Sequence, residues 1–273
     1  IDRLVIADLK ETIIQLTKYQ KNSKDKSWQE KCLHWKEVFP KCEDSFKTVG
    51  EVDLYFLAEC LSNSLPNDAT FVSDSGLIEL ILPPNISFKN GQRCIHPSSQ
   101  GSMGFALPGL VGAYFASKKP VVAVIGDGSI MMNLQELETI VYNKIPAKII
   151  VINNNAYAVI RKRQVDLFRS RTIGVDPSDG ISCPNFKKIA AAFKIPYIKI
   201  VDSNDLLDKL NSVMNTPGPV LCEVMGKEDQ DYIMTHYAKN SKNRLVRRPI
   251  EDQAPFIDRE LFLSEMIIDP IDQ

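Results

Sequence analysis

The stretch VVAVIGDGS at residues 121–129 contains a continuous apolar run that is followed directly by the tetrapeptide GDGS. A second stretch, KIIVINNN at residues 148–155, has the same form, with an apolar run that ends in asparagines. Strands that are buried on both faces have continuous apolar sequences, whereas half-exposed strands alternate apolar and polar residues. We therefore predict two parallel strands, residues 120–125 and 148–152, in a sheet that helices cover on both sides.

Helix-like and strand-like segments alternate along most of the chain. We expect helices at residues 52–61, from 108 onward, around 134–141, at 186–193 and at 205–214, and further strands at 70–73, 92–95, 197–201 and 220–224. Such alternation is typical of α/β proteins. The predicted fold class is α/β, with a doubly wound, mostly parallel sheet of about six strands and helices on both faces.

The remaining segments differ from this pattern and suggest how the chain is organised. Residues 1–20 have apolar residues at helical spacing, and residues 21–48 are rich in lysine and read as an ordered linker. The polar stretch 161–183 contains glycine and proline and predicts a long loop. Residues 228–273 predict a tail with one or two short helices, in which Arg244, Arg247 and Arg248 are expected to be surface charges.

The composition excludes several classes of protein. With 273 residues, 44 % hydrophobic and 25 % charged, the chain is neither collagen-like nor wholly disordered. A net charge of −1 offers no electrostatic reason to expect nucleic acid or a membrane surface as partner. The apolar stretch 103–116 is shorter than the roughly 20 residues of a membrane span. Six dispersed cysteines without a C-x-x-C pair predict free thiols and a cytoplasmic protein.

The polar residues that follow the two apolar strands form the main candidate site. Asp127 and Asn154 lie 27 residues apart and each follows a strand, so both are expected at the carboxyl edge of one sheet, where α/β proteins bind ligands. Carboxylate and amide oxygens suit Mg²⁺, which is commonly shared with substrate phosphates. Gly126 and Gly128 allow close approach of the backbone to a phosphate, and Ser129 adds a hydroxyl. GDG alone also occurs in ordinary turns; its pairing with Asn-Asn after the next strand is the specific signal.

These motifs together resemble those of a known family. GDG at residues 126–128 with Asn-Asn at 153–154 is similar to the thiamin-diphosphate fingerprint, and GSMGFALP at 101–108 resembles a segment of acetolactate-synthase-like enzymes. The resemblance covers residues 51 to about 230, which are similar to the diphosphate-binding domain of that family. A weaker similarity, at residues 155–161, 182–184 and 249–252, is to a subgroup associated with bacterial surface-sugar gene clusters.

The resemblance implies roles for individual residues. Mg²⁺ would be held by Asp127, Asn154 and the backbone carbonyl of Ala156. Gly101 would offer its carbonyl to the aminopyrimidine, and Met103 would bend the cofactor into its V shape, although a methionine can equally serve core packing. Met132 could either line the cofactor or pack in the core, and the sequence does not decide between these two roles. The full set of predicted cofactor-binding residues is Gly101, Ser102, Met103, Gly126, Asp127, Gly128, Ser129, Met132, Asn154, Ala156 and Tyr157.

The family also implies an activity and partners. A 2-oxo acid such as pyruvate would lose carbon dioxide, and its two-carbon unit would be transferred to an acceptor carbonyl. The alternatives are a lyase or decarboxylase acting on a sugar or aldehyde acceptor, and a non-catalytic module that retains the fold. The family's catalytic glutamate lies on a pyrimidine-binding domain, which nothing in this sequence resembles, so no catalytic residue is assigned here. We expect that domain as a partner, in the same full-length chain or a second subunit, within a homodimer or homotetramer.

The same resemblance divides the chain into three parts: residues 1–50 as a remnant of a middle domain with its linker, residues 51–230 as the cofactor-binding domain, and residues 231–273 as a tail. The sequence leaves the roles of three polar residues undecided. His96 lies near the expected site edge and is either catalytic or a surface residue. The basic stretch 161–171 is either a solvated face or a mobile lid in which Arg161 or Gln164 reaches a substrate carboxylate.

Overall fold

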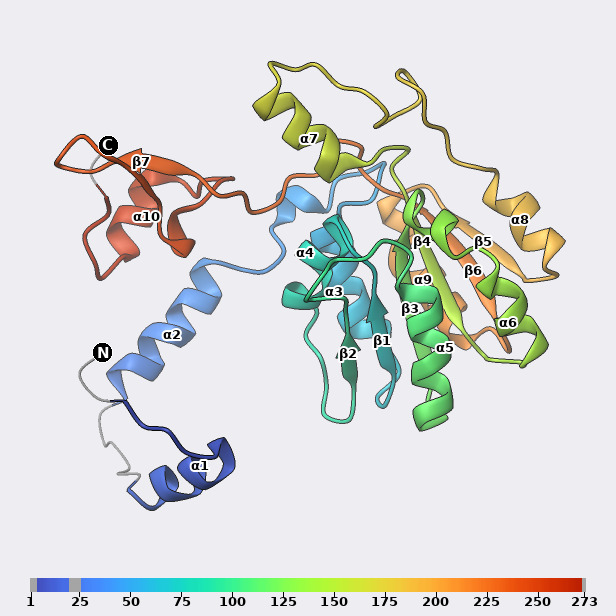
Figure 1. The fold of residues 1–273 in the computed structure, drawn as a ribbon, viewed down its shortest axis with the longest axis horizontal. Helices are drawn as coiled ribbons and strands as arrows, with labels where there is room; N and C mark the ends of the chain where they lie inside the picture. The colour runs from blue at the N-terminus through green and yellow to red at the C-terminus, as the bar shows by residue number, and fades with distance from the viewer. Residues whose placement is uncertain (1–3, 20–25, 272–273) are drawn as a thin grey trace. The chain divides into compact units, whose positions relative to one another are not determined.

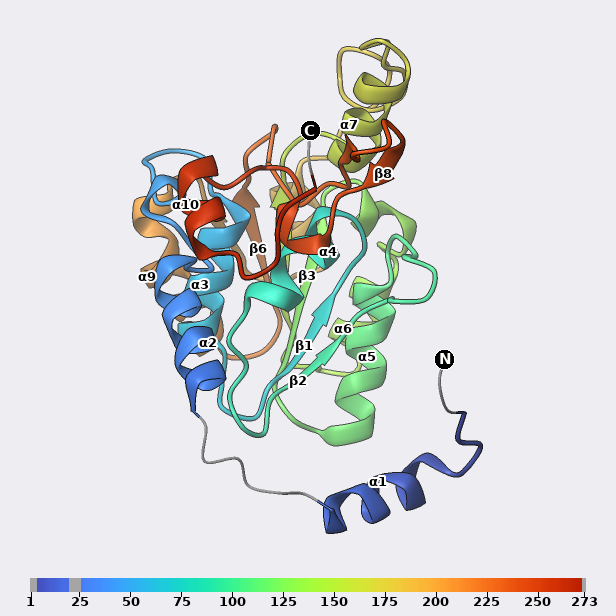
Figure 2. The same ribbon diagram turned by 90° about the vertical axis from the view of Figure 1, so that its left-hand side faces the viewer.

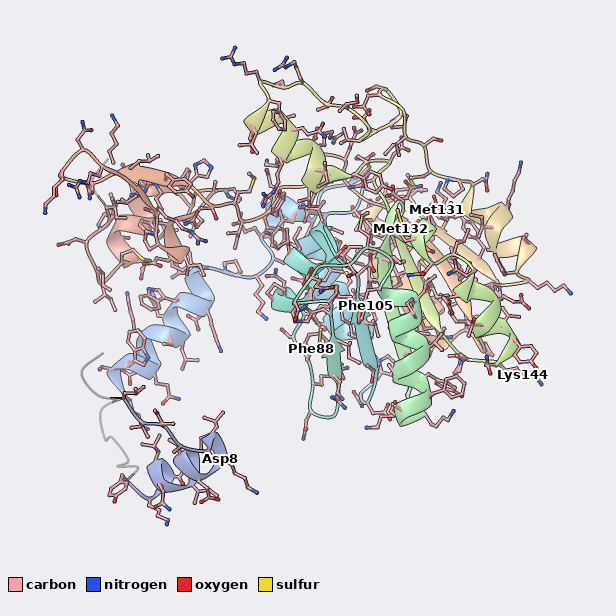
Figure 3. The ribbon with its side chains drawn as sticks, viewed as in Figure 1. Asp8, Phe88, Phe105, Met131, Met132 and Lys144 are labelled. Carbon is pink, nitrogen blue, oxygen red and sulfur yellow. The ribbon has the colours of Figure 1, made fainter. Side chains whose placement is uncertain are left out.

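The computed structural model describes residues 4–19 and 26–271, and the chain divides into two compact units, Ile1–Pro40 and Lys41–Gln273. The first unit contains two helices, α1 (Leu9–Lys18) and α2 (Ser27–Val38). Asp8, labelled in Figure 3, caps α1 by accepting the amide hydrogens of Lys10 and Glu11. The helix in residues 1–20 is confirmed, whereas α2 is a helix within the stretch predicted as a linker.

The second unit is built around a six-stranded sheet (Figure 1). Its strands are β1 (Thr70–Ser73), β2 (Arg93–Ile95), β3 (Val121–Gly126), β4 (Lys148–Asn153), β5 (Tyr197–Ile200) and β6 (Val220–Met225). The spatial order is β2-β1-β3-β4-β6-β5, and every neighbouring pair is parallel. The predicted α/β class with a parallel sheet of about six strands is confirmed.

Helices cover both faces of this sheet (Figure 2). Along β3, Val122 and Val124 belong to one buried cluster, while Val121, Ala123 and Ile125 belong to another, because successive side chains of a strand point to opposite faces. The first cluster includes residues of α3 (Leu54–Ser64), α4 (Leu77–Asn85) and α9 (Leu206–Asn215). The second includes residues of α5 (Ala106–Ser117), α6 (Glu136–Tyr142) and α8 (Phe186–Ala192).

The strand order creates a switch point between β1 and β3. The helix that follows β1, α4, packs on one face of the sheet, whereas α6, which follows β3, packs on the other. The chain therefore leaves these two neighbouring strands in opposite directions, and a crevice opens between their carboxyl ends. This crevice is the position in which ligands of doubly wound sheets bind.

Two helices in this unit were not predicted. The sequence of α4 ends in Pro83 and Pro84, residues that normally argue against a helix, but both lie in its last turn. α7 (Ala158–Leu167) falls largely within the predicted loop 161–183; it has no buried residue, so its sequence carries no apolar periodicity. Within the two described segments, no helix combines the length and the apolar character needed to cross a membrane.

The last part of the chain contains a hairpin as well as the expected short helices. Strands β7 (Tyr237–Lys239) and β8 (Leu245–Arg247) pair antiparallel, and they are followed by the 3₁₀ helix η4 (Ile250–Asp252) and by α10 (Arg259–Glu265). Arg244 and Arg247 are exposed, as expected. Arg248 is not a surface charge: it is buried and ion-paired to Asp252, which also binds Arg259 at 2.7 Å. The buried carboxylate holds both guanidinium groups, a constraint that composition does not reveal.

The central strand β4 provides a direct test of this core. Ile150 is fully buried, so Ile150→Ala should lower the free energy of unfolding by about 2–5 kcal/mol through lost burial and a residual cavity. The control Ile250→Ala, at a side chain that is 83 % exposed, should change it by less than about 0.5 kcal/mol. Urea denaturation followed by circular dichroism measures both values. Equal effects of the two substitutions would contradict the assignment of β4 to the core.

Candidate functional site

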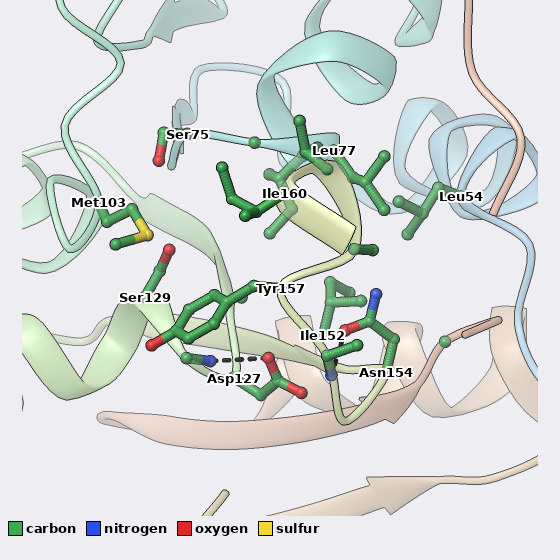
Figure 4. Close-up of a pocket in the computed structure, with 18 of the residues that line it drawn as sticks. Leu54, Ser75, Leu77, Met103, Asp127, Ser129, Ile152, Asn154, Tyr157 and Ile160 are labelled. Atoms are coloured by element: carbon green, nitrogen blue, oxygen red, sulfur yellow. Dashed lines mark hydrogen bonds between the residues drawn. The ribbon is translucent and has the colours of Figure 1, made fainter. Parts of the chain in front are cut away.

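A cavity of about 220 Å³ lies at the carboxyl ends of β3 and β4, beside the start of α4 (Figure 4). Nine of the eleven residues predicted to bind the cofactor line it, namely Gly101, Met103, Gly126, Asp127, Gly128, Ser129, Asn154, Ala156 and Tyr157. Ser102 and Met132 are not among the lining residues. Ser75 and Gly76, which follow β1, complete the wall on the other side of the switch point.

Asp127 is held by the backbone at the end of β3. Its Oδ1 accepts the amide hydrogen of Gly128 and its Oδ2 that of Asn155, both at 2.7 Å. Burial raises the pKa of this carboxyl group, while these amides and the Cys183 thiol lower it. Among the described residues, none forms an ion pair with Asp127. The site therefore contains a buried carboxylate without a positive partner, which a bound cation would stabilise in its ionised form.

The asparagines after β4 point in different directions. Asn154 lines the cavity, and its Oδ1 accepts the amide hydrogen of Ala156 at 3.3 Å. Asn153 instead donates to Glu223 through its Nδ2 at 2.7 Å. Asn155 has a φ of 55°, a left-handed conformation that asparagine tolerates better than most residues and that turns the chain back toward the cavity. Only one amide of the Asn-Asn pair is thus available to a ligand.

Glu223 supports this turn and was not predicted from the sequence. It is 5 % exposed, in the middle of β6, and it accepts hydrogen bonds from Asn153 and from the hydroxyl of Tyr197. Burial and this carboxylate raise the pKa of Tyr197. The sequence did contain a signal for this role, namely a charged residue inside the apolar run 220–225. An ionisable group in a buried strand needs hydrogen-bonding partners, so its presence there indicates a structural or functional role.

Gly128 packs closely against the ring of Tyr157. A Cβ atom at Gly128 would lie 2.3 Å from Cε1 of the tyrosine ring, a distance that no side chain can occupy. The backbone at Gly128 has an ordinary φ of −76°, so the obstacle to a larger side chain is steric and not conformational. Figure 4 shows the Tyr157 ring lying between Met103 and Asp127, so the ring forms part of the cavity wall.

The loop 101–106 forms the opposite wall. Gly101 and Met103 line the cavity, and Met103 is 45 % exposed although its side chain is apolar. Gly104, at φ +82°, packs so closely that an added Cβ would lie 2.7 Å from Cβ of Met132. Met132 therefore contacts the outside of this loop. Figure 3 shows it near the carboxyl end of the sheet, away from Lys144, which follows α6.

Comparison with known proteins agrees with this arrangement. Residues 74–224 match the family described as thiamine pyrophosphate enzyme, C-terminal TPP binding domain. The chain belongs to this family. Its curated relatives include the acetolactate synthase large subunit of Porphyra purpurea, 29 % identical over 83 % of this chain, and the acetolactate synthase isozyme 2 large subunit of Escherichia coli K12, 30 % identical over 72 %. The matched regions are 39 % and 35 % of those relatives.

The residues present fit the group that this thiamin-diphosphate family binds. Both Gly126 and Gly128 line the cavity, and a Cβ at Gly126 would meet no atom nearer than 3.9 Å, so a diphosphate has room to approach this part of the turn. Asp127 and Asn154 add oxygen atoms of the kind that Mg²⁺ accepts. The cavity volume is below the roughly 300–1,000 Å³ of typical small-molecule sites, so this chain by itself encloses only part of such a ligand.

The three residues left open by the sequence have partners within the chain. Arg161 is paired with Asp176 at 3.5 Å, with Asp229 at 2.8 Å and with Glu228. Gln164 accepts the amide hydrogen of Ile173 at 2.8 Å and donates to its carbonyl at 3.3 Å. Nδ1 of His96 lies 3.3 Å from Oε1 of Glu79. Arg161 and Gln164 thus hold α7 against neighbouring segments in this structure, and neither lines the cavity.

The packing of Tyr157 on Gly128 can be measured by a double-mutant cycle. Gly128→Ala should destabilise the protein by about 1–3 kcal/mol, because the new methyl group overlaps the ring. In the Tyr157→Ala background the same change should cost much less. Thermal unfolding of the four proteins gives the coupling. An unchanged cost in the double variant would show that the ring is not what excludes the methyl group.

The thiol of Cys183, which lies beside Asp127, should react slowly with alkylating reagents. Burial, with the charge of Asp127, raises the pKa of Cys183 from 9.0 to about 12. At about pH 8 its thiolate fraction should be about 1,000-fold lower than that of an unshifted thiol, since 12 − 9 is three pH units. Iodoacetamide labelling read by mass spectrometry should be slow in the native protein and should reach the rate of a free thiol in urea. Equally fast labelling in both states would contradict this environment.

Proposed function

We propose that this chain forms the diphosphate- and Mg²⁺-binding part of a thiamin-diphosphate-dependent enzyme that decarboxylates a 2-oxo acid such as pyruvate and transfers the two-carbon unit to an acceptor carbonyl. One observation carries the proposal. The buried carboxylate of Asp127, which forms no ion pair with any described residue, lines one cavity with Asn154 and Met103. The printed names of the relatives, acetolactate synthase large subunits, support the choice of reaction.

Each group in the cavity has a proposed role. Asp127 and Asn154 hold Mg²⁺ through side-chain oxygens, and Ala156 does so through its backbone carbonyl. Gly126, Gly128 and Ser129 contact the diphosphate, with Tyr157 covering the turn. Gly101 accepts a hydrogen bond from the aminopyrimidine, and Met103 supports the bend of the cofactor. Ser102 and Met132 lie outside the lining of the cavity and contribute through the loop and turn to which they belong.

Thiamin diphosphate, when bound, would supply the nucleophilic carbon chemistry of the reaction. The residues of this chain bind and orient. Asp127, buried and held by two backbone amides, presents its oxygens in one arrangement without reorganising. The apolar side chains of Leu77, Ile78 and Ile160 line the cavity and reduce the access of water. Groups that are held in a fixed geometry react faster, because they do not have to be brought together during the reaction.

The remainder of the site is proposed to come from elsewhere. The chain spans 39 % of the length of the Porphyra relative, and its cavity encloses only part of a ligand. We propose that residues 51–230 are the cofactor-binding domain, that residues 1–50 continue a middle domain, and that residues 231–273 form a tail. A pyrimidine-binding domain, in the same full-length protein or in a second subunit, would supply the catalytic glutamate within a homodimer or homotetramer.

Calorimetry tests the cofactor site. Thiamin diphosphate titrated into the protein should release heat with Mg²⁺ and much less with EDTA. Asp127→Asn keeps the shape of the side chain but removes its charge, and should weaken binding by at least about 100-fold. Asp208→Asn, at an exposed position on α9, is the matched control and should bind like wild type. Binding that is indifferent to Mg²⁺ and to Asp127 would refute the metal site.

The reaction is tested separately on the full-length protein. Pyruvate should be consumed with release of carbon dioxide, and products formed with added aldehydes or sugars identify the acceptor. Mg²⁺-dependent binding without any turnover of 2-oxo acids would favour a non-catalytic module.

A further inference from the structure

Asp74 is a buried carboxylate that has no role in the cavity described above. It follows β1 directly, on the side of the switch point opposite to Asp127, and is 0 % exposed. It does not line the cavity, although the next two residues, Ser75 and Gly76, do. An ionisable group in such a place is costly unless its oxygens are satisfied, so its partners indicate what it does.

The hydrogen-bond partners of its side chain belong to the loop that contains Met103 and to the start of α5. Oδ2 of Asp74 accepts the amide hydrogen of Gly104 at 3.1 Å, and Oδ1 accepts that of Ala106, the first residue of α5, at 2.9 Å. Ser129, on the turn that follows β3, lies near this carboxylate and lowers its pKa. The carboxylate thus holds the loop that contains Met103 and the start of α5, and it lies beside the turn.

The loop and the turn also contact each other directly. Nδ2 of Asn133 donates to the carbonyl of Gly104 at 3.0 Å. A Cβ at Gly104 would lie 3.1 Å from the carbonyl oxygen of Ser129 and 2.7 Å from Cβ of Met132. The loop therefore rests on the turn, and the carboxylate of Asp74 holds the loop there. Burial raises the pKa of Asp74, while the amides of Gly104 and Ala106 lower it.

This arrangement couples two parts of the cavity that are far apart in the sequence. Gly101 and Met103 lie just before the amides bound by Asp74, and Ser129 is one of the residues proposed to contact the diphosphate. A shift of either segment would change the distance between the two ends of a ligand that spans them. A displacement of a binding group by about 1 Å is enough to impair catalysis.

We infer that Asp74 is a positioning residue that sets the loop 101–106 and the turn 126–129 in one fixed arrangement, so that both ends of the cofactor site are preformed. The inference rests on the proposed function for the identity of the ligand. The physical link itself is independent of that identity.

Hydrogen exchange on the whole protein tests the link. In Asp74→Asn the amide group keeps one acceptor oxygen, but its NH₂ faces a backbone donor, so the fold should persist while the link weakens. Mass spectrometry should show exchange at Gly104 and Ala106 about tenfold faster or more, because a charge-assisted hydrogen bond is lost. Exchange should also rise across the turn 126–129. Asp258→Asn, which removes the charge of another helix-capping aspartate at α10, should leave both segments unchanged.

Calorimetry with thiamin diphosphate and Mg²⁺ supplies the second measurement. Asp74→Asn should weaken binding about tenfold, and Asp74→Ala should weaken it further, so that the conservative variant partly rescues the site. The effects of Asp74→Asn and Ser129→Ala on affinity should be less than additive, because both disturb the same packing of the loop on the turn.

The outcomes separate the two ideas. Faster exchange in both segments supports the inference, whether or not the ligand is thiamin diphosphate. Faster exchange at Gly104 and Ala106 alone, with an unchanged turn and unchanged affinity, would mean that Asp74 only caps α5 and would overturn it. If wild type shows no Mg²⁺-dependent binding, the proposed function fails, and the exchange data alone decide the role of Asp74.

Discussion

The register between β3 and β4 is the constraint on which the site depends. Gly126 pairs with Ile152, so the residues that follow these strands leave the sheet side by side. Backbone hydrogen bonds fix this register, and the buried side chains on both faces make a slip costly. The amide of Asp127 itself donates to the carbonyl of Ile152 at 2.9 Å, which continues the pairing beyond the strand. Two residues 27 positions apart in the chain thereby lie in one cavity.

Three buried carboxylates organise the walls of the cavity. Asp74 holds the loop 101–106, Asp127 holds the turns after β3 and β4, and Glu223 holds Asn153. Asp74 and Asp127 are satisfied by backbone amides, and Glu223 by side-chain donors. Such networks are stabilising when every member is satisfied, and they restrict the segments to one arrangement. A cavity that must accept a charged ligand gains from this rigidity, because little reorganisation is needed on binding.

Much of the fold was predictable because its signals are local. The uninterrupted apolar runs of β3 and β4 required burial on both faces, and the alternation of helices and strands required a parallel sheet. The predictions failed where local signals were weak or misleading. α7 has no buried face, so contacts such as those of Arg161 with acidic residues nearly 70 positions away hold it, and α4 ends in two prolines that normally argue against a helix. Arg248 was expected at the surface because its spacing of four residues from Asp252 is equally common for exposed ion pairs and does not show that this pair is buried.

The features of the site also fall into those that the sequence determined and those that the tertiary structure decided. The sequence by itself determined the class of fold, the carboxyl-edge position of Asp127 and Asn154, and the resemblance to thiamin-diphosphate enzymes, since each follows from strand periodicity or a short motif. Only the tertiary structure decided which asparagine faces the cavity, that the Tyr157 ring packs against Gly128, and that Asp74 holds the loop that contains Met103. Those features depend on atoms brought together by sheet register and loop packing, and contacts across 25 to 70 residues leave no periodic trace in the sequence.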